Sequence, residues 1–298
     1  MPEVVAYGPD PAQFLELTLP EGEGPAPVAV VLHGGFWRAA YGVELARPLA
    51  AELAAAGWAA VAVEYRRVGA GGGWPQTCAD VAAALDTLPD VAPGRLDLAE
   101  LVVLGHSAGG HLAAWAAGRA RLPDGAPGAA PRVRVTAAVL QAGVLDLGLA
   151  HEQGLGDGAV RAFLGAESAD VPAADPARLL PTGAALLCVH GAEDDTVPVS
   201  QSERYARLAG EAGDAVEVRV VPGDHMSVID PTGPAFRIAL EWVDGRRTER
   251  VKRITLDRWQ KRSRAGGSPG RWSASPPTTT RSTRRSSAPS RPAPAASR

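Results

Sequence analysis

The sequence predicts an α/β protein in which a mostly parallel sheet is covered by helices on both faces. Two observations carry this prediction. Strand-length apolar runs alternate with helix-length segments over the first 245 residues, and this alternation is typical of parallel strands joined by crossover helices. Most of the strand-like runs are apolar at every position rather than at every second one, as expected of strands that are buried on both faces.

Each element is expected from its local pattern. A period-two alternation predicts a half-exposed strand near the start of the chain, and continuous apolar runs predict the buried strands after it. Helical spacing predicts the helices, one of which a proline opens and another of which a glycine ends. The expected strands are 14–19, 28–33, 58–66, 101–105, 135–143, 184–191 and 216–223. The expected helices are 43–57, 75–88, 108–120, 200–213 and 234–243.

Two stretches depart from this alternation. Residues 144–182 lie between two expected strands, and we expect them to form a small inserted cap. Residues 246–298 carry 15 basic and two acidic residues, a net charge of +13, whereas residues 1–245 carry −16. This Arg-, Ser- and Pro-rich tail cannot bury enough apolar surface to offset its ordering entropy, so we expect it to be disordered. The sheet domain is expected to span residues 1–245.

The composition argues against several partners and locations. A basic tail suits nucleic acid, but this one offers no helix-turn-helix, zinc ligands or aromatic stacking platform, and no nucleic acid is expected to bind the sheet domain. The acidic N-terminus lacks a positively charged start followed by an apolar core. No apolar run is long enough to cross a membrane. We therefore expect a cytoplasmic protein with no membrane association.

The stretch GHSAG at residues 105–109 stands between an apolar strand-like run and an alanine-rich helix-like one. Gly-x-Ser-x-Gly at such a junction is the nucleophile elbow of the α/β-hydrolase fold. The turn is so tight that small residues must flank the serine, which leaves the hydroxyl of Ser107 exposed at the sheet edge. The helix that begins there directs its N-terminal amides and its positive dipole end at the site. Ser107 is therefore the predicted nucleophile.

A serine needs a base to take its proton and an acid to orient that base, and in this fold they follow in the order serine, acid, histidine. His225 lies on a loop before the last helix, where the base belongs. His151 precedes every candidate acid, and His190 closes a strand, where a structural role is expected. The acid should lie just past that strand, in VHGAEDDTVP. Asp194 is our choice, with Asp195 as the alternative.

Donors for a tetrahedral oxyanion must be preformed. One is expected to be the backbone N–H of Ala108, directly after the nucleophile. The other is expected in VVLHGGFWR, after an early strand, where Gly34 and Gly35 let the backbone approach a substrate.

Four motifs carry a resemblance to a known family: HGGFW at 33–37, GHSAGG at 105–110, HGAEDDTVP at 190–198 and DHMSVIDP at 224–231. With them the chain resembles the α/β-hydrolase superfamily from about residue 14 to 245. Within it, the likeness is closest to kynurenine formamidases (arylformamidases) and their bacterial esterase relatives. The resemblance implies that Ser107, Asp194 and His225 form the triad and that Gly34, Gly35 and Ala108 surround the oxyanion.

The residues and the resemblance together imply a serine hydrolase that needs no metal or cofactor and acts on a small molecule. The leading expected substrate is N-formylkynurenine, cleaved to kynurenine and formate as in tryptophan catabolism. The alternatives are a short-chain carboxylester and, in another class, a binding module with slow turnover. Phe36 and Trp37 are expected to crowd the acyl side of the pocket, unless Trp37 braces the loop or lies in the core. Monomer and homodimer both stay open.

Overall fold

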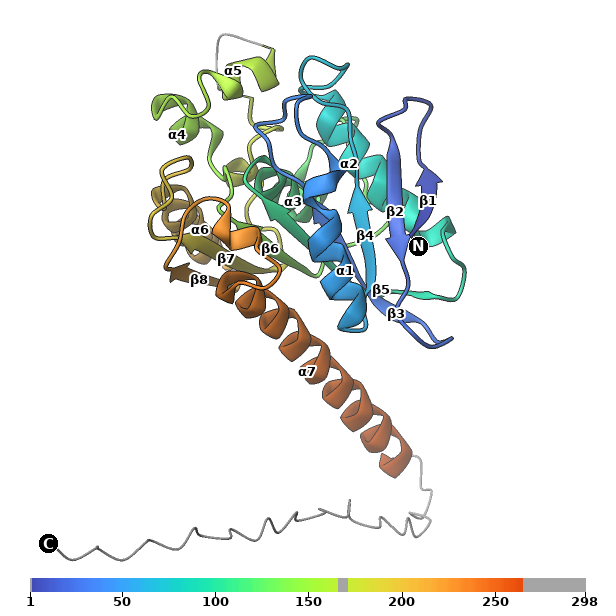
Figure 1. Cartoon of the computed structure of the whole chain (residues 1–298). Coiled ribbons are helices and arrows are strands. Elements are labelled where there is room, and N and C mark those ends of the chain that lie inside the picture. Colours follow the sequence, from blue (N-terminus) through green and yellow to red (C-terminus); the bar gives the residue numbers. More distant parts are fainter. Residues whose placement is uncertain (1, 166–170, 265–298) are drawn as a thin grey trace, which may run out of the picture. The chain divides into compact units, whose positions relative to one another are not determined.

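Eight strands of the described chain form a sheet in the order β1-β2-β4-β3-β5-β6-β7-β8 (Figure 1). The computed structural model describes residues 2–165 and 171–264. β1 and β2 pair antiparallel, as do β2 and β4, whereas every other neighbouring pair is parallel. The strands are β1 Glu3–Ala6, β2 Phe14–Thr18, β3 Ala26–Leu32, β4 Ala59–Val63, β5 Leu96–His106, β6 Ala137–Gln141, β7 Ala185–Gly191 and β8 Val216–Val221. The predicted α/β class is confirmed.

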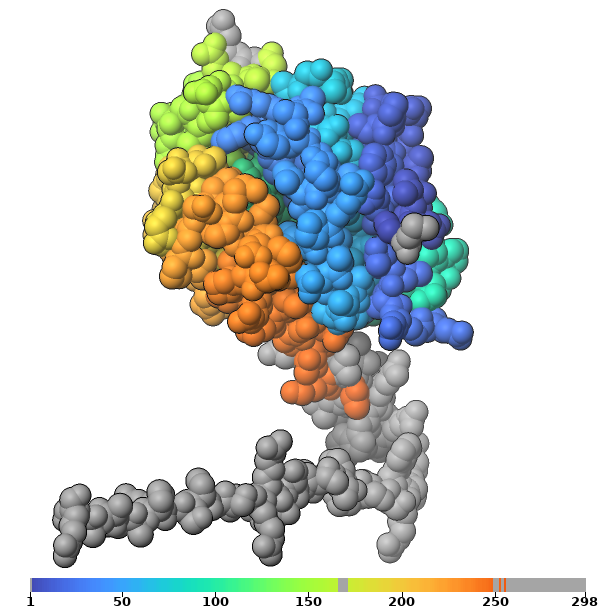
Figure 2. All heavy atoms as spheres, viewed as in Figure 1, coloured from blue at the N-terminus to red at the C-terminus, as the bar shows by residue number. Residues whose placement is uncertain are grey.

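Helices cover both faces of this sheet, as predicted. Successive strand residues point to opposite faces, so Val30 packs in the core beneath α2, α3 and α6, whereas Val31 packs beneath α1 and the start of α7. Figure 2 shows this second face, on which α1 and the chain around the start of α7 lie side by side. The helices are α1 Arg47–Ala55, α2 Gln76–Thr87, α3 Ala108–Gly118, α6 Ser200–Ala212 and α7 Pro234–Arg264.

Two features of the sheet were not predicted. The edge strand β1 is only four residues long and mostly exposed, so its own sequence carries no burial pattern, and it forms by pairing with β2. β5 begins at Leu96 rather than at residue 101, because Leu96 and Asp97 pair with the start of β3 before the register shifts. Strand pairing thus determines β1 and the start of β5, which the apolar pattern of the chain does not predict.

The expected cap lies between β6 and β7. It contains α4 Leu147–Glu152, α5 Ala159–Leu164 and a 3-10 turn, η4 Pro176–Arg178 (Figure 1). Phe163 anchors it to the sheet domain, since its ring stacks on Trp37 with centroids 4.4 Å apart. The carbonyl oxygen of Phe163 also accepts a hydrogen bond of 2.6 Å from the amide of Trp74. The cap is therefore packed against Trp74 and against Trp37, which follows the loop of Gly34 and Gly35 (the glycine loop).

The last helix corrects the predicted start of the tail. α7 continues to Arg264, although disorder was expected from residue 246. Residues 246–264 are rich in Arg and contain no glycine or proline, a composition that favours helix. Residues up to Val251 group as one compact unit, and a second unit begins at Lys252. The disorder expected for residues 265–298 lies outside the described residues. Among the described helices, none is long and apolar enough to cross a membrane.

Candidate active site

Ser107 lies in the tight turn between β5 and α3. Its backbone has φ 54° and ψ −117°, a positive-φ conformation that costs a non-glycine residue energy and persists only where the surroundings impose it. Gly105 and Gly109, on either side of Ser107, are required because no side chain would fit there. A Cβ on Gly105 would lie 2.0 Å from the carbonyl oxygen of Gly109, and one on Gly109 would lie 2.1 Å from that of Leu32. The spacing of the elbow motif therefore lets the turn close and places Ser107 at the start of α3.

A pocket of about 250 Å³ contains both Ser107 and His225. Its size is slightly below the roughly 300–1,000 Å³ of ordinary ligand pockets, which suits a small substrate. The walls are mainly apolar and come from the loop after β3, from η1 (Val43–Leu45) and from the loop that carries His225. The other lining residues are Gly35, Phe36, Tyr41, Leu45, His106, Thr196 and Met226.

The predicted base and acid are in contact. Nδ1 of His225 donates a hydrogen bond of 2.7 Å to Oδ2 of Asp194, which leaves Nε2 as the nitrogen that can accept a proton. Asp195 is exposed instead, and its carboxylate accepts a hydrogen bond from Oγ1 of Thr196. The geometry therefore favours Asp194 over Asp195 as the acid of the triad.

The surroundings of Asp194 keep its carboxylate ionised. Burial by itself would raise the pKa, but hydrogen bonds from His190, from His225 and from the amide of Val197 outweigh burial and hold the pKa of Asp194 well below its usual range. An ionised carboxylate is what the proposed base needs, because it stabilises the imidazolium that forms when the ring takes a proton.

The glycine loop lies against the nucleophile. A Cβ on Gly34 would come within 3.1 Å of the Cβ of Ser107 and 2.9 Å of Nδ1 of His106. Gly35 lines the pocket, and Ala108 is the first residue of α3, where the first amides of a helix have no partner within it. These positions suit Gly34, Gly35 and Ala108 to surround an oxyanion next to Ser107.

A buried network that the sequence did not reveal lies beneath this loop. The ring of His33 stacks on Tyr65 with centroids 4.3 Å apart, and its Nε2 lies 3.0 Å from Oε1 of Glu64. Oε2 of Glu64 accepts a hydrogen bond from the amide of Val43. The network ties the start of the glycine loop to the end of β4. In the sequence, only His33 of the His-Gly-Gly motif pointed to this network, and no pattern pointed to Glu64.

The two aromatic residues after the glycines take different places. Phe36 lines the pocket, as expected. Trp37 does not: it is 1% exposed, stacked on Phe163 of the cap and edge-on to His111 of α3. Its large ring gains more from burial between loop and cap than from facing a small pocket. Trp37 therefore belongs to the core that braces the loop.

His106 is a further residue of the pocket that was not predicted. Its Nε2 donates to the carbonyl oxygen of His225 at 2.9 Å, and the two rings are 4.5 Å apart. Burial, reinforced by the nearby His225, lowers the pKa of His106 to about 3, so its ring is neutral at ordinary pH. The signal was its place directly before Ser107. Through this hydrogen bond His106 holds the loop that carries His225 in place.

Comparison with known proteins places this geometry in a family. The model of the BD-FAE family matches residues 15–208, more than half of the 298-residue chain. The chain belongs to the BD-FAE family. The matched segment includes the glycine loop, the nucleophile elbow and Asp194, while His225 follows it.

The BD-FAE chain is similar to several esterases. Esterase LipC of Mycobacterium tuberculosis is 35% identical over 115 residues, which are 38% of this chain and 28% of that protein. The match therefore spans less than a third of that relative. Esterase B from Lactobacillus Rhamnosis (HN001) has a TM-score of 0.73 at 22% identity, over 88% of each chain, which shows the fold. The native esterase 2 of Thermogutta terrifontis is 26% identical with a TM-score of 0.67, over 83% of this chain and 92% of that one.

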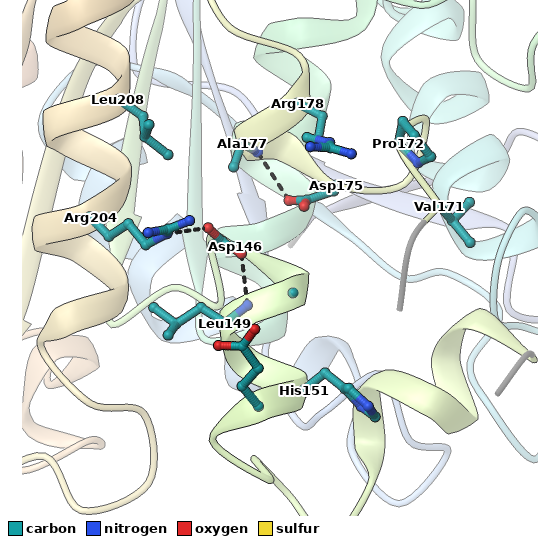
Figure 3. Close-up of a pocket in the computed structure, with 12 residues that line it drawn as sticks. Asp146, Leu149, His151, Val171, Pro172, Asp175, Ala177, Arg178, Arg204 and Leu208 are labelled. Atoms are coloured by element: carbon teal, nitrogen blue, oxygen red, sulfur yellow. Dashed lines mark hydrogen bonds and ion pairs between the residues drawn. The ribbon is translucent and has the colours of Figure 1, made fainter. Parts of the chain in front are cut away.

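A second, larger cavity in this BD-FAE chain lies at the cap. It has a volume of about 590 Å³ and is walled by α4, α6 and η4 (Figure 3). Asp146 accepts hydrogen bonds from Arg204 and from the amide of Leu149, and Asp175 accepts one from the amide of Ala177. Its described lining holds no serine, threonine or cysteine: Asp146, Gly148, Leu149, His151, Glu152, Val171, Pro172, Asp175, Ala177, Arg178, Arg204 and Leu208. The smaller pocket is therefore the candidate active site.

Proposed function

We propose that this BD-FAE chain is a serine carboxylesterase that hydrolyses short-chain esters. One observation carries the proposal. The strained Ser107 meets His225 in a single small pocket beside the glycine loop, and His225 in turn contacts Asp194. This is the arrangement of nucleophile, base, orienting acid and oxyanion donors that acyl transfer requires.

Each residue has a defined task in the proposed reaction. Oγ of Ser107 attacks the ester carbonyl while Nε2 of His225 takes its proton. Asp194 holds the imidazolium that results, and the backbone amides of the glycine loop and of Ala108 stabilise the oxyanion. His225 then gives the proton to the leaving alcohol. A water, deprotonated by the same ring, releases the acid from the acyl-enzyme.

The choice of an ester over the N-formyl amide rests on the relatives. LipC, esterase B and esterase 2 are all described as esterases, which favours the carboxylester over the formamide that the motif resemblance implies. The small pocket volume and the position of Phe36 support a short acyl group. The alcohol of an ester is also a better leaving group than the amine of an amide, because the amine must be protonated first.

A substrate series tests the proposal. We expect turnover of p-nitrophenyl acetate and butyrate with kcat/KM well above that for N-formylkynurenine, and a steep fall at octanoate, because a pocket discriminates by roughly 10–200-fold per methylene. The control is Ser107→Ala, which should lower kcat by about 10⁴-fold or more, since the triad acts as a unit. A higher kcat/KM for N-formylkynurenine than for the p-nitrophenyl esters would favour the formamidase over the carboxylesterase. Stoichiometric ligand binding without turnover would favour a binding module.

A further inference from the structure

The carboxylate of Asp194 is shared by two histidines. Oδ2 accepts the hydrogen bond from Nδ1 of His225 at 2.7 Å, and it also lies 3.3 Å from Nε2 of His190. Oδ1 accepts from the amides of Thr196 and Val197, at 2.9 and 2.8 Å. The two backbone bonds hold one oxygen only, so a carboxylate held by them alone can still rotate about that oxygen. His190 contacts the other oxygen, the one that faces the proposed base.

The partners of His190 define which of its ring nitrogens faces Asp194. Nε2 faces two acceptors, the carbonyl oxygen of Val197 at 2.8 Å and Oδ2 of Asp194, so it carries the hydrogen. Nδ1 lies 2.7 Å from Oγ of Ser202 on α6, a hydroxyl that can donate a hydrogen bond to it. His190 and Ser202 are both fully buried, and the side chain of Asp194 is buried as well. The ring is thus held in place by Ser202 on one side and by Val197 on the other, with the carboxylate of Asp194 as the second, longer contact of Nε2.

We infer that His190 is a positioning residue for the proposed esterase reaction. It holds Oδ2 of Asp194 in the orientation that His225 needs and shares the negative charge of that carboxylate. The inference rests on the proposed function, because a carboxylate has to be aimed only if His225 works as a base. The ring of His190 would act as a charge-assisted hydrogen-bond donor to the carboxylate. In a buried site, the gain or loss of one such donor changes the basicity of the carboxylate.

The direction of the effect follows from the shared oxygen. A hydrogen bond from His190 stabilises the ionised Asp194 and weakens its pull on the imidazolium of His225. Without this donor, Asp194 attracts the imidazolium more strongly, so the pKa of the base in catalysis should rise. The same loss frees the carboxylate to rotate, which should slow proton transfer.

The other titratable groups nearby do not replace His190. His106 packs against His225 but is neutral. Asp224 is on the His225 loop, and its Oδ1 accepts from the amides of Met226 and Ser227. Burial raises the pKa of the Cys188 thiol, next to Ser202, to about 12. The donors to Oδ2 recorded in the described residues are therefore the two histidines.

Two substitutions separate a positioning role from a purely structural one. The amide nitrogen of Gln reaches the place of Nε2, whereas the amide of Asn reaches only the place of Nδ1. His190→Gln thus keeps a donor for Asp194, and His190→Asn keeps only a partner for Ser202. Active sites are counted with a fluorophosphonate, and kcat, KM and the rate of labelling are measured with p-nitrophenyl acetate across pH.

We expect His190→Asn to lower kcat per active site by about tenfold or more with KM within about twofold, and to move the acid limb of kcat/KM upward by about 0.5–1 pH unit. His190→Gln should stay within about threefold of the native chain with its acid limb unmoved. If His190→Asn does not fold, Ser202→Ala, which loosens the ring, carries the same test with a smaller shift in the same direction.

The inference is overturned if His190→Asn, or Ser202→Ala in its place, keeps the native kcat per active site and the native acid limb. It is also overturned if His190→Gln behaves as His190→Asn does, because the donor is then irrelevant. A native chain that neither turns over p-nitrophenyl acetate nor reacts with the fluorophosphonate overturns the proposed function itself, an outcome distinct from both.

Discussion

Asp194 and Asp195 are identical in chemistry and adjacent in the chain, and only their surroundings separate them. The side chain of Asp194 is buried and in contact with His190 and His225, whereas Asp195 is exposed. The difference comes from the turn after β7, which sends successive side chains in different directions. A local pattern finds the cluster of carboxylates, but the direction of each side chain depends on where β8 and its loop lie.

The pair provides a matched test of the proposed triad. Asp194→Asn should lower kcat by about 10³-fold or more, because an amide cannot stabilise the imidazolium of His225 and favours the wrong tautomer. Asp195→Asn, one residue away and exposed, should leave kcat within about twofold. Both are measured with p-nitrophenyl acetate after counting active sites. Equal losses in the two variants, or a larger loss in Asp195→Asn, would remove Asp194 from the triad.

At the scale of elements, the cap and the glycine loop are built together. Phe36 lies against Gly156 of the cap, where a Cβ would come within 2.7 Å of the phenyl ring. Arg38 donates a hydrogen bond to the carbonyl oxygen of Gly156, and Trp37 stacks on Phe163. Three consecutive loop residues thus contact the cap, and the cap fixes the wall that Phe36 presents to the pocket.

Phe36 should therefore limit the length of the acyl group. Phe36→Ala opens the pocket, and we expect the ratio of kcat/KM for p-nitrophenyl butyrate over acetate to rise by about tenfold or more. Phe36→Leu should fall between the native chain and Phe36→Ala. The ratio cancels any loss of active enzyme, so it reports on the pocket alone. An unchanged ratio in both variants would place the acyl group elsewhere.

The cap also contains a carboxyl group that titrates near neutrality. Burial, and next the charge of Asp146, raise the pKa of Asp175 to about 6. The unfolded value is about 3.9, so the native state binds more protons between about pH 4 and 6. Ionised Asp175 therefore destabilises the fold at pH 7, and this cost disappears as the pH falls through about 6 toward 4.

Asp175→Asn removes that charge and keeps an oxygen to accept from the amides of Leu147 and Ala177. We expect it to raise Tm by roughly 2–5 °C at pH 7.5 and to give no advantage near pH 4. The measurement is thermal unfolding across pH. Asp146→Asn is the contrasting variant, since it weakens the ion pair with Arg204 and should not raise Tm. A gain in Asp175→Asn that does not depend on pH would contradict the titration.

How much of these elements could be predicted from the sequence depends on what stabilises each one. β3 and β4 are apolar throughout and β7 is apolar as far as His190, and burial on two faces makes such runs easy to recognise as strands. The elbow could be predicted because a turn this tight accepts only glycine at positions 105 and 109, so the motif is visible in the sequence. For Trp37 the sequence left pocket, loop brace and core as alternatives, because its partner Phe163 lies far along the chain. The length of α7 was underestimated, because a charged segment can form a helix without an apolar face of its own.

At the scale of the whole molecule, the acidic sheet domain and the basic C-terminal segment are distinct. The first 245 residues carry a net charge of −16 and the remaining 53 a net charge of +13. All the residues of the proposed site lie in the first segment. The start of α7 belongs there as well, since Phe236, Ala239 and Val243 are buried in the core beneath the sheet.

The contacts of α7 with the sheet domain predict where the chain can be shortened. Nε1 of Trp58 donates to Asp244 at 2.9 Å, and Arg247 contacts the carbonyl oxygen of Ala56. A chain that ends at Val251 keeps all of these and should hold Tm within about 2 °C, because the contacts named here all lie before that residue. Its kcat/KM for p-nitrophenyl acetate should be that of the full chain.

A chain that ends at Leu240 is the matched comparison, because it loses the buried Val243 and the partner of Trp58. Burying one such side chain is worth about 1.5–3 kcal/mol, so Tm should fall by at least roughly 3–6 °C. Thermal unfolding of the three chains at equal concentration and salt decides between them. A fall of several degrees already at Val251 would mean that residues 252–298 stabilise the sheet domain, and their basic charge would then be the first feature to neutralise.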